Sequence, residues 1–301
     1  MRKNIETEQL FFHGIGKRYP YFEGWYLKHQ YMGHTVAFIP AVHAGKNGQW
    51  TASIQVITEE GTWNFNYPAK ECRIEKNFFC VKIGNNLFTE KGINVRLQND
   101  EVSISGRILY SEFHRLESDI MGIFRYLPFM QCSHGVLSMA HSLRGHLCIN
   151  GEKTEFTGGR GYAETDWGKS FPKHYIWSQC EFGSRGMDSI MVSVADVPLP
   201  GKCFRGCICA AHYQGREYRL ATYRGAKIKG YGEGKIVLRQ GRMVLIVTRM
   251  ENKAFSLHAP REGRMERIIR ESPACKVHYQ LRKGKKTVFN LISSEASFEQ
   301  A

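Results

Sequence analysis

Short runs of alternating apolar and polar residues, rich in β-branched side chains, occur along most of the chain. Successive side chains of a strand point to opposite faces, so such runs are typical of strands half-buried in a sheet. Turn-forming Gly and Asn residues separate them, and no segment of convincing length shows helical periodicity. The pattern predicts an all-β fold of barrels or sandwiches. The clearest strand candidates cover residues 35–40, 51–57, 101–109, 189–194, 235–238 and 276–281.

One stretch in the middle of the chain departs from this pattern. Residues 113–129 are predicted to form a short helix or an irregular bridge, which ends at Leu127-Pro128. A glycine-rich segment follows at residues 158–161. We therefore predict two β domains of similar size, covering residues 1–155 and 156–301, that meet in the middle of the chain.

Composition indicates a soluble globular protein, with 42% apolar and 23% charged residues among 301. No apolar run approaches the ~18 residues that span a bilayer, and no apolar region follows the basic residues at the start, so we expect no signal peptide. The nine scattered cysteines favour free thiols in a reducing cytoplasm. Cys203, Cys207 and Cys209 lie close together without zinc-site spacing, so we expect no metal.

Positive charge is concentrated in the last third of the chain. Residues 201–301 hold 21 Lys and Arg against 8 Glu, whereas residues 1–200 hold 21 against 20 acidic residues. The basic residues are dispersed singly along predicted strands, and no nucleic-acid motif accompanies them. They are therefore either a solvated outer face or a surface attracted to an anionic membrane. We predict no nucleic-acid partner.

The segment YFEGWY at residues 21–26 places an acid among aromatic side chains. In a strand, Glu23 would share a face with Tyr21 and Trp25, while Tyr26 would point to the other side. An apolar surrounding disfavours the charged carboxylate and raises its pKa. Glu23 is therefore a candidate proton donor; the alternative is a structural carboxylate bonded to Arg, Lys or a backbone amide.

A second aromatic segment, residues 161–172, carries two acids. In a strand, Tyr162, Glu164 and Asp166 project to one face, and Trp167 to the other. Two carboxyls about 6–7 Å apart on one face repel when both are ionised, so one tends to keep its proton. This arrangement favours a general acid. Alternatively, either acid caps a turn or neutralises a nearby base such as Arg160.

A third candidate is His141, the one polar side chain in an apolar stripe of residues 137–143. It is either a core histidine satisfied by one hydrogen bond or a cavity histidine able to accept a proton near neutral pH. The sequence shows no nucleophile elbow, P-loop or dinucleotide fingerprint, which argues against common hydrolases, phosphoryl transfer and NAD chemistry.

These motifs resemble those of a known family. YFEGWY at residues 21–26 resembles the opening signature of the tocopherol cyclase family, and residues 161–172 followed by 176–180 (IWSQC) resemble its central signature. The chain carries Thr165 where the family often has Lys, and Asp166 where plant members tend to carry Asn. The resemblance extends over residues 20–182.

The resemblance implies a fold of two lipocalin-like antiparallel β-barrels packed side by side, with a hydrophobic cavity near their junction. It also implies a cofactor-independent reaction: an acid protonates a prenyl double bond, and a phenolic oxygen or water traps the cation. We predict Glu164 as the acid, with Asp166, Glu23 and His141 assisting. The predicted substrate-binding side chains are Tyr21, Trp25, Tyr26, Tyr162, Trp167, Phe171 and Trp177.

The predicted ligand is a hydrophobic small molecule: an isoprenoid, a prenylated phenol or another lipid. The alternative to an enzyme is a carrier that uses the same cavity to sequester a lipid or pigment, with the acids holding its polar head. Either protein would be cytoplasmic, with a possible peripheral contact to membranes.

Overall fold

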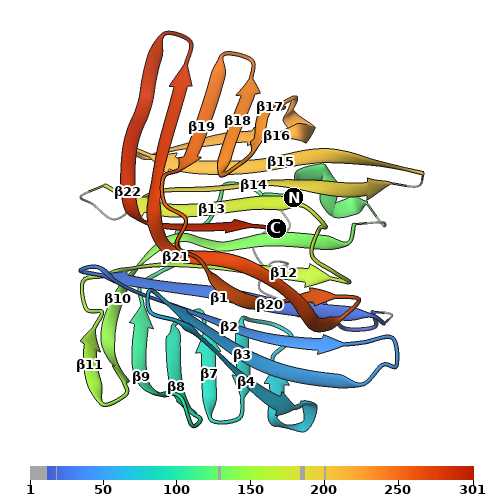
Figure 1. Cartoon of the computed structure of the whole chain (residues 1–301), viewed down its shortest axis with the longest axis vertical. Coiled ribbons are helices and arrows are strands. Elements are labelled where there is room, and N and C mark those ends of the chain that lie inside the picture. Colours follow the sequence, from blue (N-terminus) through green and yellow to red (C-terminus); the bar gives the residue numbers. More distant parts are fainter. Residues whose placement is uncertain (1–11, 18, 128–129, 184–186, 200) are drawn as a thin grey trace.

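The computed structural model describes residues 12–17, 19–127, 130–183, 187–199 and 201–301. The start of the chain and the predicted end of the bridge at Pro128 therefore lie outside the described residues. The described part forms two large antiparallel sheets, stacked one above the other in Figure 1. Each sheet curls around a core of its own, so the predicted all-β fold of two lipocalin-like barrels is confirmed.

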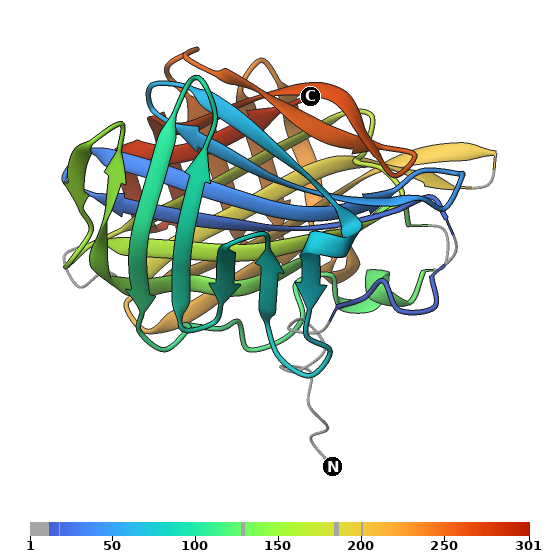
Figure 2. The same ribbon diagram turned by 90° about the horizontal axis from the view of Figure 1, so that it is seen from below.

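The first sheet contains the strands of the N-terminal half. Its order is β4-β3-β2-β1-β12-β10-β9-β8-β7-β6-β5, and β11 pairs with β10. The short strands β6 to β9 lie across the long strands β1 to β4, as Figure 2 shows in teal and blue. The bounds are β1 Tyr21–Tyr31, β2 His34–Ala44, β3 Trp50–Thr58, β4 Thr62–Pro68, β5 Cys72–Ile74, β6 Cys80–Ile83, β7 Asn86–Thr89, β8 Gly92–Gln98, β9 Ser103–Tyr110, β10 Cys132–Ile149, β11 Glu152–Glu155 and β12 Arg160–Gly168.

The second sheet contains the strands of the C-terminal half. Its order is β16-β15-β14-β13-β22-β21-β19-β18-β17, and β20 pairs with β21. The bounds are β13 Tyr175–Phe182, β14 Asp188–Leu199, β15 Lys202–Tyr213, β16 Arg216–Ala221, β17 Lys227–Gly232, β18 Lys235–Gln240, β19 Met243–Arg249, β20 Phe255–Arg261, β21 Arg264–Lys283 and β22 Lys286–Gln300.

The predicted strands and bridge have counterparts in this structure. All six predicted segments fall within strands, although the one at residues 101–109 begins two residues later, at Ser103. The bridge contains the 3-10 helix η2, Gly122–Tyr126; two further 3-10 helices are η1, Ala69–Glu71, and η3, Thr222–Arg224. Among the described residues, no helix is long and apolar enough to cross a membrane.

The change from one sheet to the other falls between Gly168 and Tyr175. A division into domains 1–155 and 156–301 would assign β12 to the second half, although β12 is paired with β1 and β10 of the first sheet. The two-domain division itself remains a prediction.

Strand β1 shows why aromatic residues occupy both of its faces. Trp25 and Leu27 point into the core enclosed by the first sheet. The alternate side chains face the second sheet, where Tyr26 joins a third apolar cluster and Phe22 lines a cavity. A strand buried on both faces cannot show simple apolar and polar alternation.

The hairpin of β20 and β21 connects the two sheets through side-chain and backbone contacts. It extends from the second sheet over β2 and β3 of the first. Gln55 on β3 exchanges two hydrogen bonds with the backbone of His258, at 2.8 and 2.7 Å. Arg267 donates to the backbone oxygen of Pro172, in the segment between the sheets. The hairpin thereby covers one part of the space between the sheets.

Candidate active site

A cavity of about 160 Å³ lies between the two sheets; we call it the central cavity. Side chains from both sheets, the bridge and the β20–β21 hairpin surround it. No Lys or Arg is among the described residues that line it. Most of the lining is apolar or aromatic: Phe22, Tyr26, Ile39, Met121, Phe124, Met130, Phe171, Trp177, Ile208, Leu257 and Ile269.

Glu164 is a buried carboxyl group on the wall of this cavity. Strand β12 directs Tyr162 and Glu164 to the same face, and the Tyr162 hydroxyl donates to Oε2 of Glu164 at 2.5 Å. Glu164 is only 5% exposed. Its pKa is raised to about 8, mainly by burial and also by the charge of Asp166, while His134 and the Tyr162 bond act to lower it. Glu164 is therefore mainly protonated at neutral pH.

His134 lies beside Glu164 and forms an ion pair with Asp166. The two residues are directly opposite in the β10–β12 pairing, and Nδ1 of His134 is 2.8 Å from Oδ1 of Asp166. Nε2 of His134 lies 3.5 Å from Oε2 of Glu164. Burial alone would lower the pKa of His134, but Glu164 when it is ionised, together with the charge and hydrogen bond of Asp166, raises it to about 9. At neutral pH the imidazolium thus offsets the charge of Asp166.

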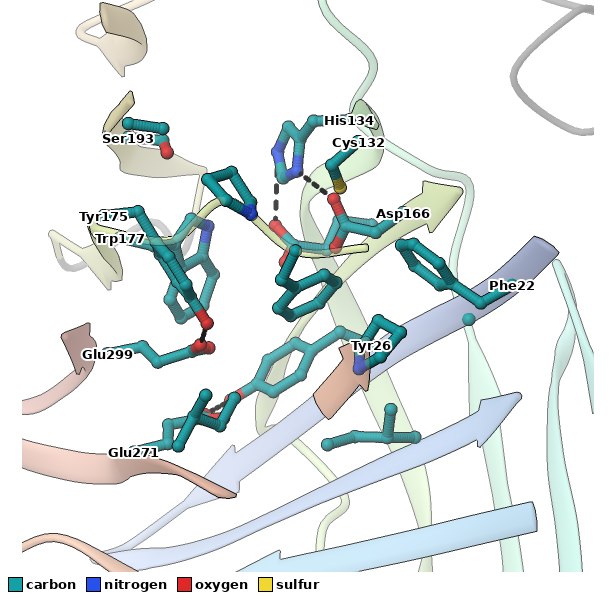
Figure 3. Close-up of a pocket in the computed structure, with 18 of the residues that line it drawn as sticks. Phe22, Tyr26, Cys132, His134, Asp166, Tyr175, Trp177, Ser193, Glu271 and Glu299 are labelled. Carbon is teal, nitrogen blue, oxygen red and sulfur yellow. Dashed lines mark hydrogen bonds and ion pairs between the residues drawn. The ribbon is translucent and has the colours of Figure 1, made fainter. Parts of the chain in front are cut away.

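Two more carboxyls belong to the opposite wall of the cavity, which the second sheet forms (Figure 3). Glu271 and Glu299 are paired across β21 and β22. The Tyr26 hydroxyl donates to Oε1 of Glu271 at 2.5 Å, and the Tyr175 hydroxyl donates to Glu299. Burial raises the pKa of Glu271 to about 7 and that of Glu299 well above its usual range. Three tyrosine–carboxyl pairs therefore surround one cavity.

Of the residues predicted from the sequence, five line the central cavity: Glu164, Asp166, Tyr26, Phe171 and Trp177. Tyr162 is fully buried behind the wall and acts through its bond to Glu164.

Glu23 lies outside the described lining of the central cavity. Its carboxyl accepts hydrogen bonds from the backbone N–H of His13 at 2.9 Å and the Tyr21 hydroxyl at 2.7 Å. The His13 ring is 2.8 Å from its other oxygen and stacks on Trp167 at 3.8 Å between ring centres. Glu23 therefore has the structural environment that was its alternative: it is bonded to the backbone amide of His13 and also, in place of Arg or Lys, to the His13 ring and the Tyr21 hydroxyl. Trp25 packs in the first core.

His141 also lies outside the described lining. Its ring lies against Tyr110 and Phe113, with centroids 4.4 and 4.8 Å apart, and Nδ1 is 3.0 Å from the Ser138 hydroxyl. Burial lowers its pKa well below 6.5. This matches the core histidine that was the other interpretation. Two irregularities in the β10–β12 register, one between Val136 and Ser138 and one between Ser138 and His141, separate His141 from the cavity-facing part of β10.

The residues that sequence reasoning missed are His134, Glu271, Glu299 and Tyr175. His134 stands in the same strand as His141, but only its position opposite Asp166 distinguishes the two. Glu271 lies between Arg270 and Ser272, and Glu299 lies between Phe298 and Gln300, so no apolar stretch in the sequence marks either acid. Nothing in the sequence places them beside Glu164.

A metal ion could be held only by a small set of side chains here. Among the described residues, His134, Glu164 and Asp166 offer ligand atoms within 4.8 Å of one another. Two internal contacts already use these donors, from Tyr162 to Glu164 and between His134 and Asp166. The side chains thus bind one another, although Nε2 of His134 has no hydrogen-bond partner among the described residues, and we derive no metal-dependent step from them.

Comparison with known proteins connects this site to a family. A family model described as tocopherol cyclase-like matches residues 90–301, which include the acids of β12 but not residues 21–26. Over 103 residues the chain is 27% identical to a rice protein (Oryza sativa subsp. japonica) named "Probable tocopherol cyclase, chloroplastic". That match covers 33% of this chain and 22% of the rice protein, so it spans about a fifth of that relative's length.

Solved structures show the same fold at low sequence identity. Kievitone hydratase from Nectria haematococca has a TM-score of 0.55 and 11% identity, over 97% of this chain and 93% of that one. CghA with Sch210972 has a TM-score of 0.56 and 10% identity, over 93% and 88%. Since the family model covers more than half of the sequence, the chain belongs to the tocopherol cyclase-like family.

Proposed function

We propose that this protein is a cofactor-independent enzyme that protonates an isoprenoid double bond in the central cavity. The observation that carries the proposal is Glu164, a buried carboxyl that burial and Asp166 keep protonated at neutral pH on an apolar wall. Membership of the tocopherol cyclase-like family supports the same chemistry. The product forms by ring closure with a phenolic oxygen or by addition of water.

The proposed reaction conserves all atoms. The Glu164 carboxyl transfers its proton to the less substituted carbon of the double bond, which leaves a tertiary cation on the other carbon and a carboxylate on the enzyme. The substrate's phenolic oxygen then forms a C–O bond to the cation. The proton that this oxygen releases restores Glu164 to its acid form. Ring closure is therefore an isomerisation, and replacing the phenol by water would make it a hydration.

Two features of the cavity would support the cation. The rings of Tyr26, Phe171 and Trp177 line the cavity, and aromatic faces attract cations by about 2 kcal/mol each when water is excluded. The Asp166–His134 pair places a carboxylate within the same cavity, and the imidazolium of His134 offsets the negative charge of that carboxylate. His141 is remote from Glu164 in this arrangement, so we assign it no proton-accepting role.

The direct test is to incubate the protein with prenylated hydroquinones in D₂O and to analyse the products by mass spectrometry. We expect a ring-closed product with one non-exchangeable deuterium at the protonated carbon. A hydrated product with the same label would identify the hydratase version. Recovery of bound but unaltered ligand would contradict the enzymatic proposal.

A carrier is the second candidate, because an apolar cavity with few polar groups also suits storage of a lipid. The Glu164→Gln variant separates the two, since Gln keeps the size of the side chain but has no acidic proton. A carrier would bind ligand with unchanged affinity and no turnover in either form. An enzyme would keep its affinity and lose turnover only in the variant.

The remaining expectations about partners stay predictions. The ligand is proposed to be a hydrophobic small molecule. Contact of the basic C-terminal third with an anionic membrane would be seen as salt-dependent binding to vesicles that contain phosphatidylserine. The predicted absence of a nucleic-acid partner is checked by salt-dependent retention on DNA or RNA.

A further inference from the structure

The titratable groups of the central cavity are mostly acids. Glu164, Asp166, Glu271 and Glu299 line it, and so does His134, which is paired with Asp166. An anionic head group taken out of water needs a cationic partner. The described lining contains no Lys or Arg to supply one. A fatty acid or a prenyl diphosphate would therefore meet carboxyl groups rather than cations.

Two basic side chains of the region between the sheets, Lys28 and Arg267, are engaged elsewhere. Lys28 is fully buried between the sheets, but its Nζ donates to the Glu295 backbone oxygen at 2.9 Å and to Oε1 of Gln179 at 3.3 Å. Arg267 donates to the backbone oxygens of Pro172 and Lys173. Neither lines the cavity, so neither offsets the excess of acids there.

One donor on the wall has no acceptor. The indole N–H of Trp177 is buried, its residue is 5% exposed, and no described protein atom accepts its hydrogen bond. A buried N–H left without a partner costs about 1–3 kcal/mol, and buried Trp N–H groups usually find an acceptor. Because Trp177 lines the cavity, a ligand oxygen placed there would satisfy it.

Trp177 is also the centre of a row of polar groups across four adjacent strands. Its register partners are Ser193 on β14 and Glu299 on β22, and Glu299 pairs in turn with Glu271 on β21. All four residues line the cavity. We call Ser193, Trp177, Glu299 and Glu271 the polar row. Side chains directly opposite on neighbouring strands lie about 4.5–5.5 Å apart, so one ligand group can contact two of them.

Resting on the proposed function, we propose that the cavity selects isoprenoid ligands with a neutral hydroxyl head over carboxylates and phosphates, and that Trp177 donates a hydrogen bond to the head-group oxygen. The polar row, labelled in Figure 3, then holds the oxygen on the second sheet. Glu164 approaches the ligand from β12 of the first sheet. A phenol both donates and accepts, which matches a row that offers an N–H, a hydroxyl and carboxyl groups. One sheet would thus hold the phenolic oxygen that acts as nucleophile, and the other would supply the acid.

Three matched ligands test this selectivity without any reaction. All carry a saturated 3,7-dimethyloctyl chain, which has no double bond to protonate, at position 2 of phenol, benzoic acid or benzene. We expect calorimetric titration at pH 7.5 to show at least tenfold tighter binding of the phenol than of the benzoate. Equal or tighter binding of the benzoate would overturn the proposal.

The Trp177→Phe variant tests the donor, because it keeps an aromatic ring and removes the N–H. We expect about tenfold weaker binding of the phenol and unchanged binding of the benzene compound. Equal weakening of both ligands would show that Trp177 acts by packing alone, and unchanged phenol binding would show that its N–H is not used. Trp63→Phe is the matched control, since Trp63 packs against the first core outside the described lining.

The outcome is separable from that of the proposed catalysis. A protein that shows the selectivity and forms no ring-closed product from prenylated hydroquinones would refute the enzymatic step alone. A protein that forms product but binds the benzoate as well as the phenol would refute the selectivity alone. Circular dichroism and thermal unfolding of each variant establish that it is folded.

Discussion

The two faces of the first sheet carry buried acids and histidines of the same kinds and place them in opposite environments. Toward the first core, Glu23 is held by three hydrogen-bonding groups and His141 lies among aromatic rings. Toward the second sheet, Glu164 shares a cavity with three other carboxyls and His134 pairs with Asp166. Similar residues thus have a structural environment on one face and a reactive one on the other.

The difference lies in what the neighbours supply. Donors around Glu23 fix its carboxyl in one geometry, which is what a structural acid needs. Around Glu164, carboxyl groups and apolar surface disfavour the charge and leave the proton in place. The sheet separates these environments because successive residues point to opposite faces. Four expected results test this difference between the two faces.

The largest expected effect is on turnover. Glu164→Gln should lower kcat by about 10²–10⁴-fold, the usual contribution of a general acid. Glu23→Gln should change kcat by less than threefold, because Glu23 does not line the cavity. Both rates are measured from ring-closed product at saturating substrate. Equal losses in the two variants would remove the distinction between the faces.

The pH dependence should distinguish the two histidines. Glu164 acts as the protonated acid, so activity should be full below its pKa of about 8 and fall about tenfold per pH unit above it. The imidazolium of His134 acts to lower this pKa, so His134→Gln should move the alkaline limb upward by about one pH unit.

His141→Gln is the control for that shift. Burial lowers the pKa of His141 well below 6.5, so the ring is neutral across the range in which Glu164 titrates. We expect the alkaline limb of its kcat profile to stay where the unaltered protein has it. A limb that moves in this variant as far as in His134→Gln would show that the two sites are coupled through the sheet.

The third effect concerns stability, and here the loss is expected on replacing Glu23 rather than Glu164. Glu23→Gln loses carboxylate contacts with His13 and Tyr21, and should lower the free energy of unfolding by about 1–3 kcal/mol. Urea unfolding at pH 7 measures this change. Unfolding at an unchanged urea midpoint would mean that the bonds around Glu23 are replaceable.

The fourth effect is a pH-dependent gain in the stability of the Glu164→Gln variant. The carboxyl is neutral in the folded protein up to about pH 8 but ionises above about pH 4.5 in the unfolded chain. Its contribution to stability is therefore complete below pH 4.5 and is lost as pH rises toward 8. The Tm of the variant relative to the unaltered protein should rise by a few degrees between pH 5 and pH 9. A Tm difference independent of pH would contradict the raised pKa.

Predictions from the sequence agree with the structure where they depend on the residues of a single strand. The spacing of Tyr162, Glu164 and Asp166 was enough to place all three on one face of β12, and their contacts agree with that placement. The spacing of Phe22, Tyr26 and Trp25 was enough to separate two faces of β1. Alternation is a local property, so no knowledge of the rest of the fold was needed.

The sequence could not show which face of a strand points into the first core and which points toward the central cavity. Both faces of β1 are buried, so the sequence could predict that Glu23 is buried. It could not predict which side chains surround the Glu23 carboxyl. His134 and His141 are seven residues apart, so alternation already puts them on opposite faces. Two irregularities in the pairing with β12, however, place Met139 in the third cluster while Leu137 stays in the first core. A bulge shifts the facing of every residue beyond it, and the partner strand determines where it forms.

By itself, the sequence determined an all-β chain, the faces of its individual strands and an acid-bearing segment that lies within the match to the family model. Only the tertiary structure decided that Glu271 and Glu299, more than a hundred residues after Glu164, close the same cavity from a second sheet. The physical reason is that strand alternation depends on backbone geometry alone. The pKa of a buried carboxyl depends on groups that only the packing of two sheets brings within reach.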